Sequence, residues 1–178
     1  MPKKSYPARS AKDTGLGLGA VIYEALLLAY SLQLYRETQL SKAMPDTNWH
    51  REHQIALELM VVKCRVLDDF LTAAGDDKDD MHALDFAYDA LTLGYPKLVG
   101  AFRKAINKRA AHLTWTRVKA APLDPWEKVS KGVEVHAVEV LKETFAFIEV
   151  TLKGGTALQT STHDGYWKAL QTVYPTLV

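Results

Sequence analysis

The chain contains a single cysteine, Cys64, among its 178 residues. One cysteine excludes an intramolecular disulfide, and because Cys64 lies in an apolar run of helical character we expect a buried thiol in a reducing compartment. Long apolar runs are also missing: none approaches the roughly 20 residues that span a bilayer, and no stretch of signal-peptide type follows the basic residues near the N-terminus. These shortages predict a soluble, cytoplasmic protein without a membrane segment.

Net charge is low too. The 22 Lys and Arg residues nearly balance the 21 Asp and Glu residues, which leaves +1 at pH 7. The molecule as a whole therefore has no field that would capture a polyanion, and any affinity for nucleic acid has to come from a local patch. Metal-binding patterns are scarce, since no His-Glu-x-x-His occurs and the aspartates in residues 76–80 lack the glycine and glutamate of an EF-hand loop. We expect no metal and no cofactor, which places a metal-dependent helical enzyme last among the interpretations.

Charges are nevertheless segregated along the chain. Residues 68–89 contain eight aspartates and one lysine, whereas residues 91–123 contain seven Lys or Arg residues and no carboxylate. The basic residues are Lys97, Arg103, Lys104, Lys108, Arg109, Arg117 and Lys119. Two interpretations stay open: these cations bind phosphate, or the aspartates neutralise them within one chain or between subunits.

Apolar residues recur at helical spacing, and no stretch keeps the two-residue period of a strand. The pattern predicts long helices over residues 20–38, 46–74, 96–114 and 124–153, and shorter ones over residues 79–90 and in the tail. Asp124 and Pro125 supply a helix start, and Gly154 supplies an end. The predicted fold is all-α, a bundle of four main antiparallel helices with short additional helices.

The same periodicity predicts which helix faces are buried and how the chain divides into three segments. Residues 1–18 are expected to be a flexible segment with Gly15, Gly17 and Gly19 as a hinge, residues 19–153 to form the bundle, and residues 154–178 to dock through Trp167. The expected core residues of three helices are Ile22, Leu26, Ala29, Leu32 and Tyr35, then Ile55, Leu59, Val62, Val66 and Phe70, then Val133, Ala137, Val140, Leu141, Phe145 and Ile148.

His112 lies within the basic segment and shares a helical face with Lys108 and Arg109. Neighbouring cations lower the pKa of a histidine, so a neutral imidazole could accept a proton from a hydroxyl while the cations stabilise charge on a phosphate. Cleavage of RNA through its own 2′-hydroxyl needs these groups and no metal. A histidine at the carboxyl end of a helix also serves as a cap, and this alternative stays open.

The run Asn-Lys-Arg-Ala-Ala-His over residues 107–112 resembles the signature of HEPN domains, in which four to six residues separate an arginine from a histidine. Residues 64–71 and 79–86 are similar to an uncharacterised bacterial branch of HEPN-like character, and the resemblance covers about residues 55–117. The chain departs from the signature at the arginine, because the three permitted positions hold Asn107, Ile106 and Ala105.

Membership of the HEPN family would imply metal-independent ribonuclease activity, frequently in toxin or defence systems, and a homodimer in which the signature histidines meet. The implied catalytic group is His112, with Asn107 at the arginine position and Arg109 and Lys108 as helpers. Residues expected to contact RNA or a nucleotide are Lys97, Arg103, Lys104, Trp115, Arg117 and Lys119, with Trp115 stacking on a base. The alternative is a non-catalytic dimeric adaptor or antitoxin-like protein that binds a protein partner.

Arg65 precedes Asp68 by three residues and Asp69 by four, so both carboxylates can reach the guanidinium on a helix. One interpretation is an internal ion pair. The other is a carboxylate that orients a neighbouring histidine. The sequence favours the ion pair.

Overall fold

The computed structural model of the chain describes residues 9–40, 47–72, 80–90, 92–95 and 124–178. Four long helices dominate these ranges: α1 (Ala11–Leu40), α2 (Thr47–Thr72), α5 (Asp124–Lys153) and α6 (Ser161–Val173). Two short 3-10 helices accompany them, η2 (Ala83–Phe86) and η3 (Tyr174–Thr176). No strand occurs in the described ranges, and the predicted all-α bundle is confirmed.

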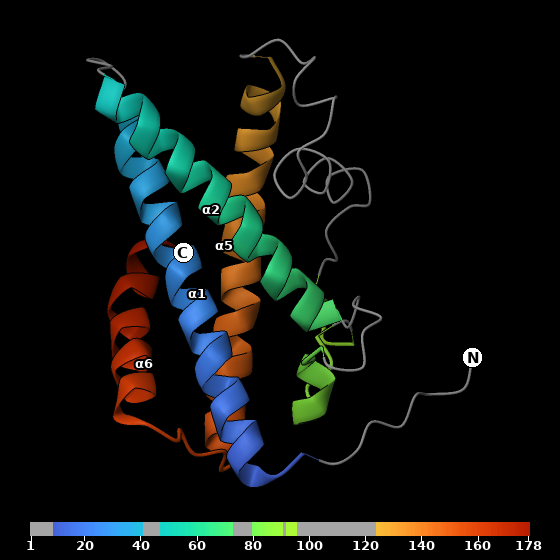
Figure 1. The fold of residues 1–178 in the computed structure, drawn as a ribbon. Coiled ribbons are helices and arrows are strands. Elements are labelled where there is room, and N and C mark those ends of the chain that lie inside the picture. The colour runs from blue at the N-terminus through green and yellow to red at the C-terminus, as the bar shows by residue number, and fades with distance from the viewer. Residues whose placement is uncertain (1–8, 41–46, 73–79, 91, 96–123) are drawn as a thin grey trace.

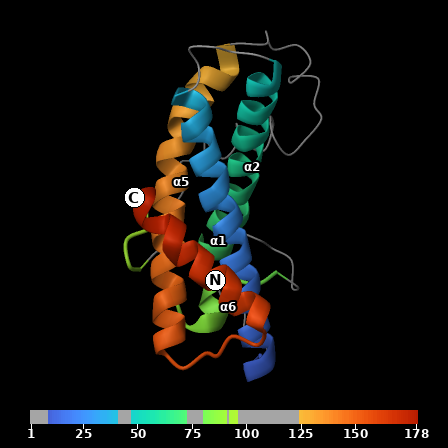
Figure 2. The same cartoon turned by 90° about the vertical axis from the view of Figure 1, so that its left-hand side faces the viewer.

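The long helices lie side by side (Figures 1 and 2). α1 runs antiparallel to α2 and to α5, α6 runs antiparallel to α5, and α2 and α5 point the same way. α1 contacts α2, α5 and α6, so it is the central helix of the described bundle. The predicted helix over residues 96–114, which would follow α2 in the chain and precede α5, lies outside the described residues.

The central helix α1 is apolar on almost every side. From Thr14 to Tyr35 its one charged residue is Glu24, and a helix of this kind is covered by protein or spans a membrane. Against the expectation that no stretch could span a bilayer, Ala11–Gln39 is long and apolar enough to cross a membrane by length and composition. In the bundle, 61% of its most apolar window is buried. All five predicted core residues of this helix are at most 6% exposed: Ile22, Leu26, Ala29, Leu32 and Tyr35.

The expected hinge at the three glycines is wrong, because α1 begins at Ala11 and contains them all. Its start is a capping pair in which the Asp13 N–H donates to Ser10 Oγ at 3.1 Å and Ser10 Oγ donates to Asp13 Oδ2 at 2.6 Å. This Ser-x-x-Asp pattern is the sequence signal for the true helix start. The glycines permit close contact: a Cβ on Gly15 would lie 2.5 Å from the carbonyl oxygen of Ala157.

The predicted buried face of α2 is also wrong, except at buried Phe70 and half-buried Leu59. Ile55, Val62 and Val66 are 53%, 39% and 43% exposed, whereas Met60 is fully buried. α1 and α5 pack on the side of α2 that carries the buried residues, and the predicted stripe faces away from them. Both sides of α2 have apolar residues at helical spacing, so periodicity could not decide which side would be covered. The buried side consists of Ala56, Leu57, Met60, Val61, Cys64, Leu67 and Leu71.

The segment after the aspartates forms the four-residue η2 instead of the helix predicted over residues 79–90. Ala87, with φ of 58°, takes the left-handed conformation that ends η2, and the Tyr88 N–H donates to the Ala83 carbonyl at 3.1 Å. Phe86 packs edge-on against Phe147 of α5, with ring centroids 5.3 Å apart. Phe70 of α2 meets the same two rings at 6.1 and 5.0 Å, so aromatic packing holds η2 against the bundle.

The helix predicted in the C-terminal tail is α6. The Thr160 side chain caps it by accepting the N–H of His163 at 3.2 Å. Trp167 packs on Phe145 of α5 with ring centroids 5.0 Å apart, and Tyr174 stacks on the same ring at 3.9 Å. The tail therefore docks through aromatic side chains, including the predicted Trp167.

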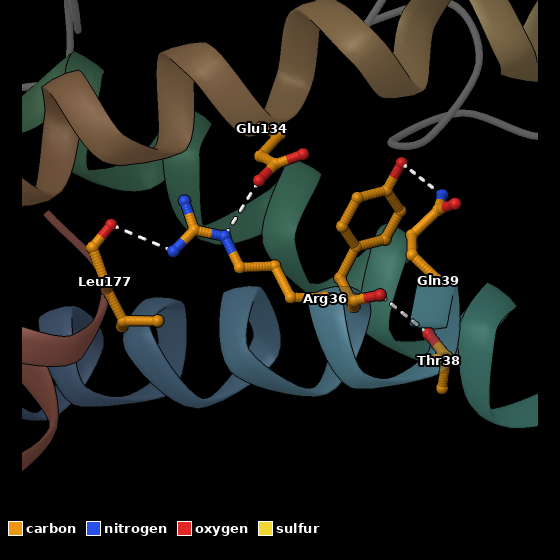
Figure 3. Close-up of polar contacts among 6 residues, drawn as sticks. Arg36, Thr38, Gln39, Glu134 and Leu177 are labelled. Atoms are coloured by element: carbon orange, nitrogen blue, oxygen red, sulfur yellow. Dashed lines mark hydrogen bonds and ion pairs between the residues drawn. The ribbon is translucent and has the colours of Figure 1, made fainter. Parts of the chain in front are cut away.

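Arg36 of α1 joins this tail to two helices (Figure 3). Its Nε lies 2.8 Å from Glu134 Oε1 of α5, and its Nη1 donates to the carbonyl oxygen of Leu177 at 3.0 Å. One helical turn away, Gln39 donates to the buried Tyr35 hydroxyl at 2.9 Å. The side chains of the ion pair are each 36% exposed, so it contributes at most about 1 kcal/mol, but it fixes the chain end against α1 and α5.

Gly15→Ala should lower the free energy of unfolding by about 1–3 kcal/mol, because the added methyl group would overlap a backbone carbonyl that cannot rotate away. The matched control is Gly165→Ala in α6, where nothing lies within 4 Å of the new Cβ. This control should be neutral or gain up to about 1 kcal/mol from helix propensity. Urea unfolding followed by circular dichroism measures both, and equal stability of the two variants would contradict the close contact.

Candidate functional site

None of the ten residues predicted to form the site lies in the described ranges. They are His112, Asn107, Arg109 and Lys108 as catalytic candidates, and Lys97, Arg103, Lys104, Trp115, Arg117 and Lys119 as nucleic-acid contacts. The segment that carries them, residues 96–123, follows directly after Tyr95 and ends where α5 begins. Tyr95 and the start of α5 are described, so the residues that flank the basic segment in the sequence can be placed.

A buried carboxylate binds Tyr95, the last described residue before the basic segment. Asp68 of α2 is 1% exposed, and its Oδ1 accepts a hydrogen bond from the Tyr95 hydroxyl at 3.0 Å. Tyr95 is itself 6% exposed. Burial raises the pKa of Tyr95, and the charge and hydrogen bond of Asp68 raise it further, so the phenol keeps its proton and remains a donor.

A second phenol and carboxylate lie beside the first pair. Tyr88 donates to Glu143 Oε1 of α5 at 2.7 Å. Burial raises the pKa of Tyr88, and the hydrogen bond and charge of Glu143 add to the increase. Glu143 also raises the pKa of Tyr95, so the two pairs share one electrostatic environment between α2, α5 and the chain that follows η2.

His136 of α5 belongs to the same environment. Burial lowers its pKa below the ordinary value of 6.5, while the charges of Asp68 and Glu139 act in the opposite direction. Burial is the larger effect, so the imidazole is neutral at pH 7. Such a ring can accept a proton, and the field of Asp68 stabilises the imidazolium that results.

Cys64 lies one helical turn before Asp68 and is fully buried. Burial raises the pKa of its thiol, and the Asp68 charge raises it further. The thiol therefore stays protonated and unreactive, and we assign Cys64 a packing role.

The sequence offered two interpretations of the carboxylates near Arg65, an ion pair and a group that acts on a histidine. Each interpretation applies to a different carboxylate. Asp69 takes the ion pair, with 3.5 Å between Arg65 Nε and Asp69 Oδ2. Asp68 instead faces the core, where its charge acts on a histidine. That histidine is His136, which the sequence interpretation missed. Its signal was a histidine in the periodic apolar face of α5, next to Ala137.

The described cluster of Asp68, Tyr95, Tyr88, Glu143 and His136 can donate, accept and hold protons, but a phosphate would also need cations. Residues 96–123, which follow Tyr95 in the chain, contain seven cations. Within the described ranges, no three His, Cys, Asp or Glu residues are grouped to hold a metal ion. The arrangement is suited to acid/base and hydrogen-bonding chemistry.

Tyr95→Phe should destabilise the protein by about 1–3 kcal/mol, because the buried Asp68 carboxylate loses a donor that water cannot easily replace. The matched control is Tyr88→Phe, which removes a hydroxyl from the half-buried Glu143. Water can reach that carboxylate, so the loss should be below about 1 kcal/mol. Chemical unfolding at neutral pH compares them, and a larger loss for Tyr88→Phe would refute this role of Asp68.

His136 should make stability depend on pH. Its folded-state pKa is lowered, so the unfolded chain takes up the proton first as the pH falls below about 6.5, and stability then decreases. His136→Gln should show a shallower loss between pH 7 and pH 5 than the wild type. The test is the urea unfolding midpoint of both proteins, measured as a function of pH across this range. If the midpoints of wild type and His136→Gln fall in parallel, His136 does not titrate there.

No family model, curated protein or solved structure matches the chain. Function therefore has to be inferred from the chain's own residues. The relevant facts are the helical bundle, the buried cluster around Asp68 and the seven cations that follow it.

Proposed function

We propose that this protein is a HEPN-like cytoplasmic domain that binds RNA or a nucleotide through residues 96–123 and acts as a metal-independent ribonuclease of a toxin or defence system. The proposal joins the all-helical bundle to the signature-like run that ends at His112. It assigns the acid/base role to His112 and the phosphate contacts to Arg109 and Lys108.

The observation that carries the proposal is the hydrogen bond between Tyr95 and buried Asp68 at the start of the basic segment. A segment with seven cations and no carboxylate is a local binding patch for a polyanion. A patch gains affinity when its attachment is fixed, because less conformational entropy is lost on binding. Tyr95 fixes one attachment, and the start of α5 at Asp124 provides the other.

The proposed reaction uses the RNA's own 2′-hydroxyl. Neutral His112 accepts the hydroxyl proton, O2′ bonds to phosphorus, and the bond between phosphorus and O5′ breaks. His112 then returns the proton to O5′, so the products are a 2′,3′-cyclic phosphate and a 5′-hydroxyl. Arg109 and Lys108 stabilise the negative charge that builds on the phosphate oxygens.

Asn107 stands where a HEPN signature has arginine. Its amide can donate a hydrogen bond to a phosphate oxygen but carries no charge. The reaction therefore depends for its guanidinium on Arg109, three residues before His112 in the sequence. Trp115 stacks on a base, and the contacts of the remaining cations, Lys97, Arg103, Lys104, Arg117 and Lys119, are with the backbone.

The purified protein should cleave single-stranded RNA in the presence of EDTA and leave 2′,3′-cyclic phosphate ends. His112→Ala should reduce the rate by about 100-fold or more, because general acid/base catalysis typically contributes that much. Arg109→Ala should also slow cleavage, while Lys153→Ala, which removes a 75% exposed cation of α5, should not. Equal cleavage by wild type and folded His112→Ala would eliminate the mechanism.

The second candidate function is a non-catalytic dimeric adaptor or antitoxin-like protein. Two observations favour it: arginine is missing from positions 105–107, and large apolar side chains of α1 and α2 are exposed. The same experiment separates the candidates. If the protein is an adaptor, it neither cleaves nor binds RNA. It should instead bind a partner protein, with an affinity that falls as the salt concentration is raised.

A further inference from the structure

Exposed apolar side chains gather on the outer faces of α1 and α2. Among the described residues eleven large hydrophobic side chains are exposed, and six of them belong to these two helices. Single exposed hydrophobic residues are normal, but a contiguous group indicates an interaction surface. The six are Leu16, Tyr23 and Tyr30 of α1, at 41–45% exposure, and Ile55, Val62 and Val66 of α2, at 39–53%.

On α2 the exposed residues form one continuous stripe. With half-buried Leu59 they lie at positions 55, 59, 62 and 66, which are steps of four, three and four. This spacing keeps side chains on one helical face and is the seam pattern of packed helix pairs. The stripe lies on the side of α2 opposite the buried Met60 and Cys64, so α1 and α5 do not cover it.

On α1, Leu16, Tyr23 and Tyr30 follow one another at seven-residue steps and therefore share a face. α1 and α2 are neighbours (Figure 1). Lys63 Nζ of α2 lies 2.7 Å from Glu24 Oε2 of α1 and joins the two helices. The ion pair neutralises the charge between the two stripes. A cavity of about 340 Å³ lies between the two helices next to Met81, and Val66 is the member of the α2 stripe that lines it.

The α2 stripe is complementary to itself in an antiparallel arrangement. A two-fold axis that passes between positions 60 and 61 sets Ile55 opposite Val66 of a second copy, and Leu59 opposite Val62. The charges beside the stripe follow the same rule. Arg51, Glu58, Arg65 and Asp69 alternate in sign along one flank. The axis brings Arg51 within one position of Asp69 of the second copy, and Glu58 within two positions of Arg65.

α1 fits the same axis. Because it is antiparallel to α2 and Glu24 pairs with Lys63, positions 26 and 27 of α1 lie beside positions 60 and 61 of α2. The axis therefore sets Tyr23 opposite Tyr30 of the second copy. An isologous interface requires such self-complementary pairs, and here one axis provides the apolar, aromatic and charged pairs together.

We propose that a second copy of this chain binds to the outer faces of α1 and α2 with α2 antiparallel to its counterpart, so that a dimer core forms from two α1/α2 pairs. The interface uses no residue of the basic segment 96–123. This dimer differs from the HEPN homodimer in which the signature histidines meet. It rests on other residues than the proposed function, so RNA cleavage and dimerisation can each fail without the other.

Sedimentation equilibrium of the full chain tests the interface. The wild type should be a dimer at tens of micromolar, and Val62→Glu should weaken association at least about 100-fold, because it buries an unpaired charge at the centre of the interface. The matched control is Val150→Glu on α5, a 56% exposed valine outside this surface, which should remain dimeric. Circular dichroism confirms that both variants fold, and since the replaced residues are exposed in the monomer the fold should survive.

Charge reversal tests the register. Glu58→Arg and Arg65→Glu should each weaken the homodimer about tenfold, because each places like charges opposite one another on both sides of the axis. An equimolar mixture of the two variants should restore association as a heterodimer, since one supplies two arginines and the other two glutamates. If either substitution weakened association only by disturbing its own chain, mixing the two variants would not restore association.

Three results would overturn the proposal. A monomeric wild type at these concentrations excludes the dimer, and a monomer that binds phosphatidylcholine vesicles identifies the surface as a lipid-binding face instead. A folded Val62→Glu that dimerises as tightly as wild type places any dimer interface elsewhere on the chain.

Discussion

The low charge of α1 constrains the rest of the structure. From Thr14 to Tyr35 this helix carries a single charge, on Glu24, so nearly every side of it has to be covered. α2, α5 and α6 cover most of it, and Gly15 lets the chain before α6 approach its backbone. Tyr23 and Tyr30 remain 41% and 45% exposed, although the Tyr23 ring also packs on Tyr166 of α6. The bundle and the proposed dimer are thus two consequences of one apolar helix.

The carboxylate of Asp68 is buried in the apolar core of the bundle. An isolated buried carboxylate costs several kcal/mol, so Asp68 has to be compensated by donors. The Tyr95 hydroxyl is one such donor, and it fixes the chain where the basic segment begins. The field of Asp68 also reaches His136, which burial keeps neutral. The polar cluster therefore joins the stability of the bundle to the region for which function is proposed.

The two proposed surfaces involve different parts of the molecule and different forces. The outer faces of α1 and α2 offer apolar area, which favours association whatever the salt concentration. Residues 96–123 offer cations, whose affinity for phosphate falls as salt rises. In a dimer formed through α1 and α2, each subunit keeps its own Asp68 cluster and its own basic segment. Assembly and RNA binding are therefore separable in experiment.

The sequence by itself determined the all-α class, the core faces of α1 and α5 and the docking of Trp167, because each depends on local periodicity and local helix signals. Tertiary structure alone decided which side of α2 is buried, since both sides are apolar and only the positions of α1 and α5 distinguish them. It also decided that Gly15 is a contact and not a hinge. His136 was missed for the same reason: its chemistry comes from burial and from Asp68 on another helix, and neither is a property of the local sequence.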